Sequence, residues 1–563
     1  MTTPTYGIVI QETLTGLLPV QPGDFSVIGI LTTADDSQVA TFPLNTPVAF
    51  NSTDPAYLSA AGTGALANAL ESINQQLAAW ESAATVVAVV VTAGSSEAAT
   101  ITNLLGSQAS WTGLYAFASA GAVTGFIPRI LIVPGHTGYQ AFSITAPVVT
   151  AGGSGYTGGA TVSFSPAGAT ATATVVSGAV TAVTMTSPGA YAPGTTVTGT
   201  ITGTSGGTGA TFTFSKTQLA NPICAALPSV AAGLLAVAIV GSSGDGVIAD
   251  TIAWRQTLAS DRLIPSDAWV INESLQTPAT FTGSISGTTL TVSGTVTGTI
   301  VAGAALTGGT AAAGTTIVSG SGTTWTVSGS QTVASAPLTA TPPTTVYTDG
   351  VAEAAGAQAA VDFQHAGVPG WTISGHQIGG ILGLKNTYSF SLTDGSTQGQ
   401  QLLADQVAVI EPGAIASDTA IASSGYVWAG VWNASTSPLA WFVNKRRMKD
   451  YVNLALVKAI RQRLGVDNVT PHAVQAVLND MTVLGSWLLS KQISLGFAVS
   501  FVPSQNSPAQ LAQGQFVVTF ANETPAPITQ VTVESQDYPE ALTVELATII
   551  AAANTLSPQY LTS

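Results

Sequence analysis

The chain has 563 residues, a net charge of −15 and only 7% charged residues, and its length suffices for three or four domains. Although the mean hydropathy is +0.41, the longest apolar stretch, Val230–Val240, has 11 residues, fewer than the roughly 20 of a membrane-spanning helix. The negative charge argues against nucleic acid as the main partner, and the single cysteine excludes a disulfide within the chain.

The first 140 residues alternate between strand-like and helix-like segments. A short strand is predicted at Tyr6–Ile10 and a second at 26–31. Two runs rich in β-branched and other apolar residues, 86–91 and 130–133, are typical of strands that are covered on both faces. Helix-like segments lie between these strands. The alternation indicates a sheet that is layered with helices.

Two long blocks, 138–215 and 274–348, contain no Asp, Glu, Lys or Arg. Both consist mainly of Gly, Thr, Val and Ala, and Thr/Val alternation broken by Gly predicts short antiparallel strands. In the second block the nine residues Ser286–Gly294 return at Ser321–Gly329 with one change. Such a repeat favours a small β-sandwich or β-solenoid-like module over the alternative, a disordered Gly/Thr linker.

The first block contains two weaker internal echoes. Gly155-Tyr156 returns as Ala190-Tyr191, and Gly168–Thr170 returns as Gly209–Thr211.

The mixed pattern of the first 140 residues resumes after each block, which marks the blocks as insertions at surface loops. A strand at 236–240 is followed by a Gly-rich loop at 241–246. The loop lacks the Lys-Ser/Thr pair of a phosphate-binding loop, so we interpret it as a strand-to-helix turn. Further on, the sequence predicts helices at 351–365, 471–480 and 541–552, a strand at 269–271, and strands at 515–520 and 528–533.

Positive charge is concentrated between Lys445 and Arg463, which hold seven of the 13 Lys and Arg residues and one acid. The segment predicts a helix with Asn444 as its N-cap and Gly465 as its stop. Its packing face would consist of Met448, Val452, Ala455, Leu456, Ala459 and Ile460, with Arg447, Lys458 and Arg461 roughly opposite. The helix either presents this row of cations to a partner or is a solvated surface helix.

No residue pattern in the sequence suggests catalysis or a bound cofactor. The four histidines, His136, His365, His376 and His472, have no other His or Cys at metal-ligand spacing. Cys224 lies among apolar residues and is interpreted as a small buried side chain. A nucleophile elbow and an evident carboxylate pair are both missing. We therefore predict no catalytic, cofactor-binding or metal-ligating residue.

Five segments match the text of one known family. They are FVNKRR at 442–447 with Asn453 and Leu488-Leu489 following, FPLNTPV at 42–48, GTGALANALESI at 62–73, TGLYAF at 112–117 and PRILIVPG at 128–135. Together they resemble the tail sheath proteins of contractile-tailed bacteriophages, over roughly residues 1–138, 220–273 and 346–540. The chain departs from the usual family text at Met448-Lys449 and at Leu454-Ala455.

The resemblance implies an α+β fold with mixed β-sheets flanked by helices in a tail-sheath core, two inserted all-β domains and extended terminal arms. The implied divisions are an N-terminal arm at 1–20, core at 21–138, an inserted β domain at 139–219, core at 220–273, a second inserted β domain at 274–348, core with a tube-facing C-terminal domain at 349–520, and a C-terminal arm at 521–563.

The resemblance also implies a function without catalysis or cofactor. The expected role is a structural subunit that polymerises as helical rings around the tail tube and contracts to drive the tube through the host envelope for genome delivery. The implied partners are other sheath subunits, the tail tube protein, and baseplate and tail terminator proteins, with no direct nucleic-acid contact and no membrane span. The protein would be assembled in the host cytoplasm and located in the virion tail.

Two sets of interaction residues follow from the resemblance. Terminal arms of the family add strands to sheets of neighbouring subunits, which unpaired sheet edges allow, and the candidates here are Tyr6, Ile8, Ile10, Ile528, Val531 and Val533. The C-terminal domain faces the tube, and the candidates are Lys445, Arg447, Lys458 and Arg461. Two alternatives stay open: the sheath of a phage-derived bacteriocin or secretion device, and a surface adhesin that binds through the β blocks.

Overall fold

The computed structural model describes residues 24–35, 37–80, 82–193, 195–272, 278–342 and 347–556. The strand predicted at Tyr6–Ile10, and with it the candidates Tyr6, Ile8 and Ile10, lies outside these residues. The chain divides into two compact units, residues 1–526 and 527–563.

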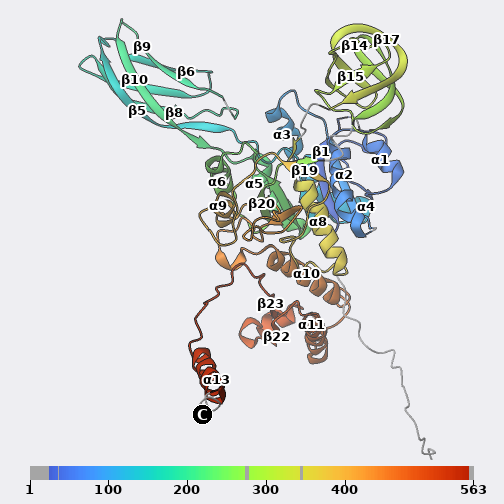
Figure 1. Ribbon diagram of the computed structural model, residues 1–563. Coiled ribbons are helices and arrows are strands. Elements are labelled where there is room, and N and C mark those ends of the chain that lie inside the picture. The colour runs from blue at the N-terminus through green and yellow to red at the C-terminus, as the bar shows by residue number, and fades with distance from the viewer. Residues whose placement is uncertain are drawn as a thin grey trace, which may run out of the picture. The chain divides into compact units, whose positions relative to one another are not determined.

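Within the described residues, the first unit is built on an eight-stranded sheet (Figure 1). In spatial order its strands are β2 (Val48–Asn51), β3 (Thr85–Val91), β1 (Ile28–Thr33), β4 (Ile130–Ile132), β11 (Val237–Gly241), β12 (Leu263–Asp267), β20 (Ala408–Pro412) and β21 (Tyr426–Ala429). The strands from β3 to β20 run parallel, and β2 and β21 pair antiparallel at the two ends. The strands predicted at 26–31, 86–91, 130–133 and 236–240 correspond to β1, β3, β4 and β11, whereas β12 was not predicted.

Helices cover both faces of this sheet, which explains why β3 is apolar at every position from Val86 to Val91. On β3, Val86, Ala88 and Val90 belong to one buried cluster, and Val87, Val89 and Val91 belong to another. The helices of the first unit up to residue 404 are α1 (Pro55–Ala61), α2 (Ala65–Leu77), η1 (Ala78–Trp80), α3 (Glu97–Leu105), η2 (Gly113–Ser119), α4 (Ala120–Thr124), α5 (Pro222–Leu234), α6 (Ile248–Gln256), α8 (Val351–Gln364) and α9 (Gln398–Ala404).

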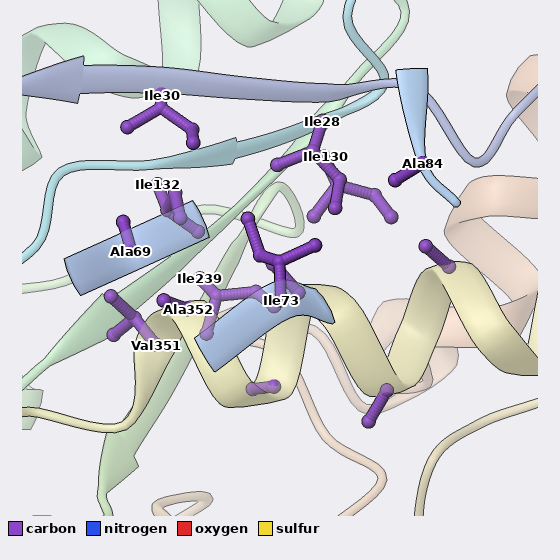
Figure 2. Packing of buried hydrophobic residues seen from close by; sticks show 14 of the residues in the cluster. Ile28, Ile30, Ala69, Ile73, Ala84, Ile130, Ile132, Ile239, Val351 and Ala352 are labelled. Carbon is purple, nitrogen blue, oxygen red and sulfur yellow. The ribbon is translucent and has the colours of Figure 1, made fainter. Parts of the chain in front are cut away.

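The larger cluster lies between the sheet and the pair α2 and α8. Figure 2 shows Ile28 and Ile130 of adjacent parallel strands pointing toward Ile73 of α2. Gly356 of α8 faces α2 so closely that an added Cβ would lie 2.8 Å from the Cα of Ile73. The two helices therefore pack backbone to backbone, and a larger residue at 356 would separate them.

The segment from 142 to 218 contains strands and, among its described residues, no helix (Figure 1). The strands are β5 (Phe142–Ser154), β6 (Ala160–Ser165), β7 (Thr170–Val176), β8 (Ala179–Ser187), β9 (Thr198–Gly203) and β10 (Thr208–Gln218). The two sequence echoes of this segment contact each other, because each tyrosine forms a hydrogen bond with the alanine of one Gly-Ala-Thr copy. The hydroxyl of Tyr156 accepts the N–H of Ala210 at 3.1 Å, and the hydroxyl of Tyr191 accepts the N–H of Ala169 at 2.7 Å.

The segment from 279 to 341 is likewise made of strands. They are β14 (Ala279–Thr297), β15 (Ala305–Gly308), β16 (Ile317–Ser321) and β17 (Thr324–Thr341). The two copies of the nine-residue repeat lie antiparallel to each other, with Leu290 paired to Trp325. This is the single position at which the copies differ, and both side chains are buried in one cluster. The repeat thus places two related strands against each other around a shared core.

A small sheet joins the second β segment to the rest of the unit. Its strands, in spatial order, are β18 (Tyr347–Thr348), β13 (Val270–Asn272) and β19 (Ile381–Leu384), all antiparallel. The remaining elements are η3 (Pro438–Ala440), α10 (Val443–Ile460), α11 (Pro471–Ser490), β22 (Gly496–Phe501), η4 (Pro503–Gln505), α12 (Pro508–Ala512), β23 (Val518–Glu523) and α13 (Glu540–Leu556). The helix predicted at 541–552 corresponds to α13, and the one at 471–480 is longer than predicted.

A buried acid on β20 makes the stability of the fold depend on pH. Glu411 is 1% exposed, and its Oε1 has no hydrogen-bond partner among the described residues. Burial raises the pKa of Glu411 from 4.5 to about 8. The folded chain therefore keeps this proton up to about pH 8, while the unfolded chain loses it near 4.5, and unfolding becomes easier as pH rises between these values.

Glu411→Gln is expected to remove this pH dependence. The variant should unfold at a higher temperature than the wild type at pH 8 and at a similar temperature at pH 4.5, because each pKa unit corresponds to about 1.4 kcal/mol. Thermal unfolding followed by circular dichroism across this range measures the difference. The exposed Glu71 provides the control, since Glu71→Gln should leave the pH profile unchanged.

Candidate interaction surface

Helix α10 contains most of the basic segment and begins two residues earlier than predicted. Its N-cap is Phe442, so Asn444 lies in the first turn and the predicted cap is wrong. Asn444 instead donates from Nδ2 to the carbonyls of Gly370 and Pro525, at 3.3 and 3.1 Å. The helix ends at Ile460, and Gly465, with φ of 75°, lies in the turns that follow. The side chain of Asn444 thus ties the helix to two loops.

The packing face of α10 differs from the predicted one. Met448, Tyr451, Val452 and Ala455 are buried in one cluster with Leu484 and Leu488 of α11. Tyr451 packs edge-on against Phe25, with 5.5 Å between ring centroids. Leu456, Ala459 and Ile460, which were assigned to the packing face, are only half-buried. The buried face of α10 therefore includes Arg447 and Tyr451, which the predicted packing face did not.

Arg447 is the clearest correction to the predicted row of cations. Its side chain is 1% exposed, and its guanidinium donates to both carboxylate oxygens of Asp362 on α8, at 2.9 and 2.5 Å. It also donates to the carbonyl of Phe25 at 3.1 Å. The side of α10 that carries Arg447 is covered by α8 and by the segment around Phe25. Arg447 therefore stabilises the subunit and is not available to an outside partner.

The other bases at the start of α10 are also paired within the chain. Lys445 lies 2.6 Å from Glu523 of β23. Arg446 contacts Asp450 at 2.5 Å and Asp261 at 3.1 Å, and Asp450 also accepts two hydrogen bonds from Arg262. Burial acts to lower the pKa of Arg446, but the two acids outweigh it and raise that pKa. The positive charge of the segment is thus largely neutralised inside the subunit.

Two cations are exposed, Lys449 of α10 and Arg461 directly after its last residue. Arg461, one of the predicted residues, is exposed at the end of the helix, and Lys458 is half-buried. Partial burial and the nearby Arg461 and Arg129 lower the pKa of Lys458. Lys449 is exposed as well and was missed, although it follows Lys445 by four residues and so lies on the same side of the helix. The exposed cations therefore occupy two sides of α10 and do not form one row.

A groove of about 400 Å³ runs between α10 and β23. Lys445, Lys449, Val452 and Leu456 line it from the helix, and Phe520, Asn522 and Glu523 line it from the strand. Leu439 lies at the same groove and is 90% exposed. The groove combines apolar side chains with two cations and one acid.

Strand β23 belongs to a sheet of two strands. It pairs antiparallel with β22 from Gly496↔Glu523 to Phe501↔Val518. Within the described part of the chain, neither strand has a second neighbour. Each strand therefore presents one unpaired edge, with backbone N–H and C=O groups that can accept a further strand.

The second unit begins at Pro527 and has few apolar contacts of its own. Ile528, Val531 and Val533 are 85%, 72% and 80% exposed, and the strand predicted at 528–533 is not formed within the described chain. A strand needs a partner for its backbone hydrogen bonds, and the segment pairs with no strand among the described residues of its own unit. Every described side chain of α13 from Glu540 to Ala553 is exposed.

Among the described residues, no group of three or more His, Cys, Asp or Glu could hold a metal ion, and no helix is long and apolar enough to cross a membrane. Cys224 is buried, and burial raises the pKa of its thiol to about 12. The ring of His365 stacks on Trp371, 3.5 Å between centroids, and does not meet Asp362.

The Gly-rich loop after β11 is a strand-to-helix turn, as predicted. It connects Gly241 at the end of β11 to Ile248 at the start of α6. The hydroxyl of Ser242 donates to Asp267 at the end of β12, at 2.7 Å. The loop is thus held by a neighbouring strand.

Known proteins resemble part of this chain, although no protein-family model matches it. It is 34% identical over 134 residues to the major tail sheath protein of Serratia phage KSP20 and 33% identical over 137 residues to the tail sheath protein of Escherichia phage P2. Each match covers 23% of this chain and 33% or 34% of the relative. The chain therefore spans about a third of the length of the curated relatives it matches.

Solved structures of contractile assemblies are similar over nearly the whole chain at low identity. The sheath complex of a contracted extracellular contractile injection system (PVC) is 12% identical, with a TM-score of 0.48 over 96% of this chain and 99% of that one. The contracted helical sheath of the anti-feeding prophage is 10% identical, with a TM-score of 0.47 over 95% of this chain and 100% of that one.

Proposed function

We propose that the chain is a structural, non-enzymatic member of the contractile tail sheath family, which polymerises as helical rings around a tail tube and contracts to drive the tube through a host envelope. The identity of 34% to a phage tail sheath protein carries this proposal. The unpaired edges of β22 and β23 and the exposed second unit support it, because a polymer needs surfaces that a single copy leaves uncovered. A phage-derived injection device would use the same polymer.

Negative-stain microscopy of the purified full chain tests this proposal. Long hollow tubes or stacked rings that form as concentration rises are the expected result. A chain that stays monomeric at every concentration, with and without its tail tube protein, would contradict it.

The second unit supplies the proposed contact between subunits. Residues 528–533 of one copy would add as a strand to the β22–β23 sheet of another, with Val531 and Val533 packing on one side. Such an addition satisfies the backbone groups of both the segment and the sheet edge. We extend the proposal to Tyr6, Ile8 and Ile10, which the sequence analysis assigned to a second arm.

The two β segments, 142–218 and 279–341, are proposed to be inserted domains on the outer side of the polymer. Each has a buried cluster of its own, formed by the residues around Tyr191 and Leu290. Each interrupts the chain between strands that pair in the main or the small sheet. We assign the tube contact to α10, because that helix carries exposed cations.

Contact with the tube is proposed for the exposed cations Lys449 and Arg461, together with Lys458. Reversing all three to Glu is expected to weaken binding to tail tubes at least tenfold at low salt, with the difference shrinking as salt screens the charges. Co-sedimentation with purified tubes at increasing salt measures this effect. Lys216→Glu, a charge reversal at an exposed residue of β10, is the control and should bind as the wild type does. Equal binding of the triple variant at low salt would refute the electrostatic contact.

The proposed place of the protein is the virion tail, after assembly in the host cytoplasm. Its further partners would be the baseplate and the tail terminator. These partners would meet the same surfaces at the two ends of the polymer, where the last ring has no neighbouring copy.

A further inference from the structure

A separate cavity lies at the carboxyl ends of the parallel strands, where open α/β sheets bind their ligands. Its volume is about 200 Å³, and it is bounded by α2, by α8 and by residues that follow β4 and β12. Figure 2 shows Ala69 of α2 and Ala352 of α8 among the buried core residues, and both also line the cavity. Small side chains at these positions leave the space open.

Two nearly buried carboxylates face the cavity from the start of α8. Asp349 is 5% exposed, and its Oδ2 accepts the N–H of Gly135 at 2.7 Å. Glu353 is 1% exposed, and its Oε1 accepts hydrogen bonds from Ser72 Oγ at 2.8 Å and from Asn272 Nδ2 at 3.1 Å. Neither acid forms an ion pair with a described residue of the chain. Buried carboxylates without a counter-charge are unfavourable, so a cation from outside would stabilise them.

The remaining walls of the cavity also suit a cation with an apolar part. Trp269 and Tyr347 line it with aromatic rings, and aromatic faces attract cations. Lys385 shows this attraction within the chain, with its Nζ 4.5 Å from the centroid of Trp269 and 5.9 Å from that of Tyr347. Thr348 contributes a buried Oγ1 that has no hydrogen-bond partner in the described part of the chain, and this oxygen can accept a hydrogen bond from a ligand.

We propose that this cavity binds an alkylammonium ion, with Asp349 and Glu353 as anionic partners, Thr348 as an acceptor and the rings of Trp269 and Tyr347 as walls. The ion would come either from a small free amine or from a lysine side chain of a second copy, because both offer the same chemistry. The residues that line the site are not part of α10, β22, β23 or the second unit.

Binding should strengthen as pH rises through about 6. Burial raises the pKa of Asp349 to about 6, with the nearby Glu353 acting in the same direction and His136 in the opposite one. Below that pH the carboxyl group is neutral and attracts an ammonium ion weakly. His136 is itself paired with Glu97, at 2.7 Å. The charged groups that act on Asp349 are therefore Glu353 and the His136–Glu97 pair.

Thermal unfolding of the full chain with 1,4-diaminobutane tests the proposal. A saturable rise in melting temperature at pH 7.5 that disappears at pH 5 is expected, and the uncharged 1,4-butanediol should give none. Glu353→Gln should abolish the rise. Ala65→Leu fills the cavity from a half-exposed position and keeps both acids, and it should abolish the rise too. This second variant keeps the test valid if Glu353→Gln fails to fold.

The absence of a saturable rise in the wild type, an equal rise with the diol, or an unchanged rise in Ala65→Leu would overturn the site. Sedimentation of the same samples separates the two sources of the ion. Assemblies that persist in the diamine identify a free amine as the ligand, and assemblies that dissolve in it identify a lysine of a second copy. Neither result depends on whether the polymer encloses a tail tube, so this test and that of the sheath role fail separately.

Discussion

Truncation after Ala526 is expected to leave a folded chain that no longer polymerises. The described side chains of 528–553 are exposed, so their removal takes away no packed core and should shift the melting temperature little. Assembly should be lost because the truncation removes residues 528–533, which supply the proposed strand added to the β22–β23 sheet. Sedimentation velocity and microscopy of the truncated and full chains measure the two effects.

A finer variant locates this effect in the strand. Val531→Ser with Val533→Ser removes two β-branched side chains from one side of the segment, whereas Gln530→Ser with Thr532→Ser changes the other side. Burial of each valine contributes about 1.5 kcal/mol or more, and each 1.4 kcal/mol is about tenfold in affinity. The valine pair should therefore raise the concentration needed for assembly about a hundredfold, and the control pair should change it little. Equal effects of the two pairs would argue against packing by one face.

Arg447→Met is expected to destabilise the first unit by about 3–5 kcal/mol, because it leaves Asp362 buried without its counter-charge. Asp362 is fully buried, and the carbonyl of Phe25 would lose a donor as well. Adding Asp362→Leu should recover most of this loss, since an apolar pair of similar volume avoids burying charge. Denaturant unfolding of the single and double variants measures both steps.

Arg461→Met serves as the matched control. Arg461 carries the same side chain on the same helix but is exposed and has no ion pair among the described residues. Its replacement should change stability by no more than about 0.5 kcal/mol. If Arg447→Met were equally mild, the buried ion pair would not hold the subunit together, and Arg447 would return to the candidates for the tube contact.

Local sequence patterns predicted strand β3 and the strands of the nine-residue repeat. The run at 86–91 is apolar at every position because helices cover both faces of β3, and that burial is visible in composition alone. The repeat at 286 and 321 predicted strands, and the structure adds that the two copies pair with each other. Strand β12 was missed because its sequence, LIPSD, contains a proline and two polar residues that disfavour a central strand.

In the basic helix, the sequence patterns did not predict which charged residues form ion pairs within the chain. Periodicity finds an apolar stripe, but it does not show which polar residues meet a partner 85 positions away, as Arg447 meets Asp362. The acids Asp261, Asp450 and Glu523 neutralise bases that the sequence left open to an outside partner. A single sequence holds no signal for these pairs. The exposed cations Lys449 and Arg461 could be separated from the paired ones only in the folded chain.

A helical reconstruction of the assembled protein by cryo-electron microscopy tests the central claim most directly. The map should show residues 528–533 of each copy as a strand along the free edge of β22 or β23 in an adjacent copy. A polymer in which that segment folds back onto its own subunit, or in which both edges stay empty, would contradict strand exchange as the link between subunits.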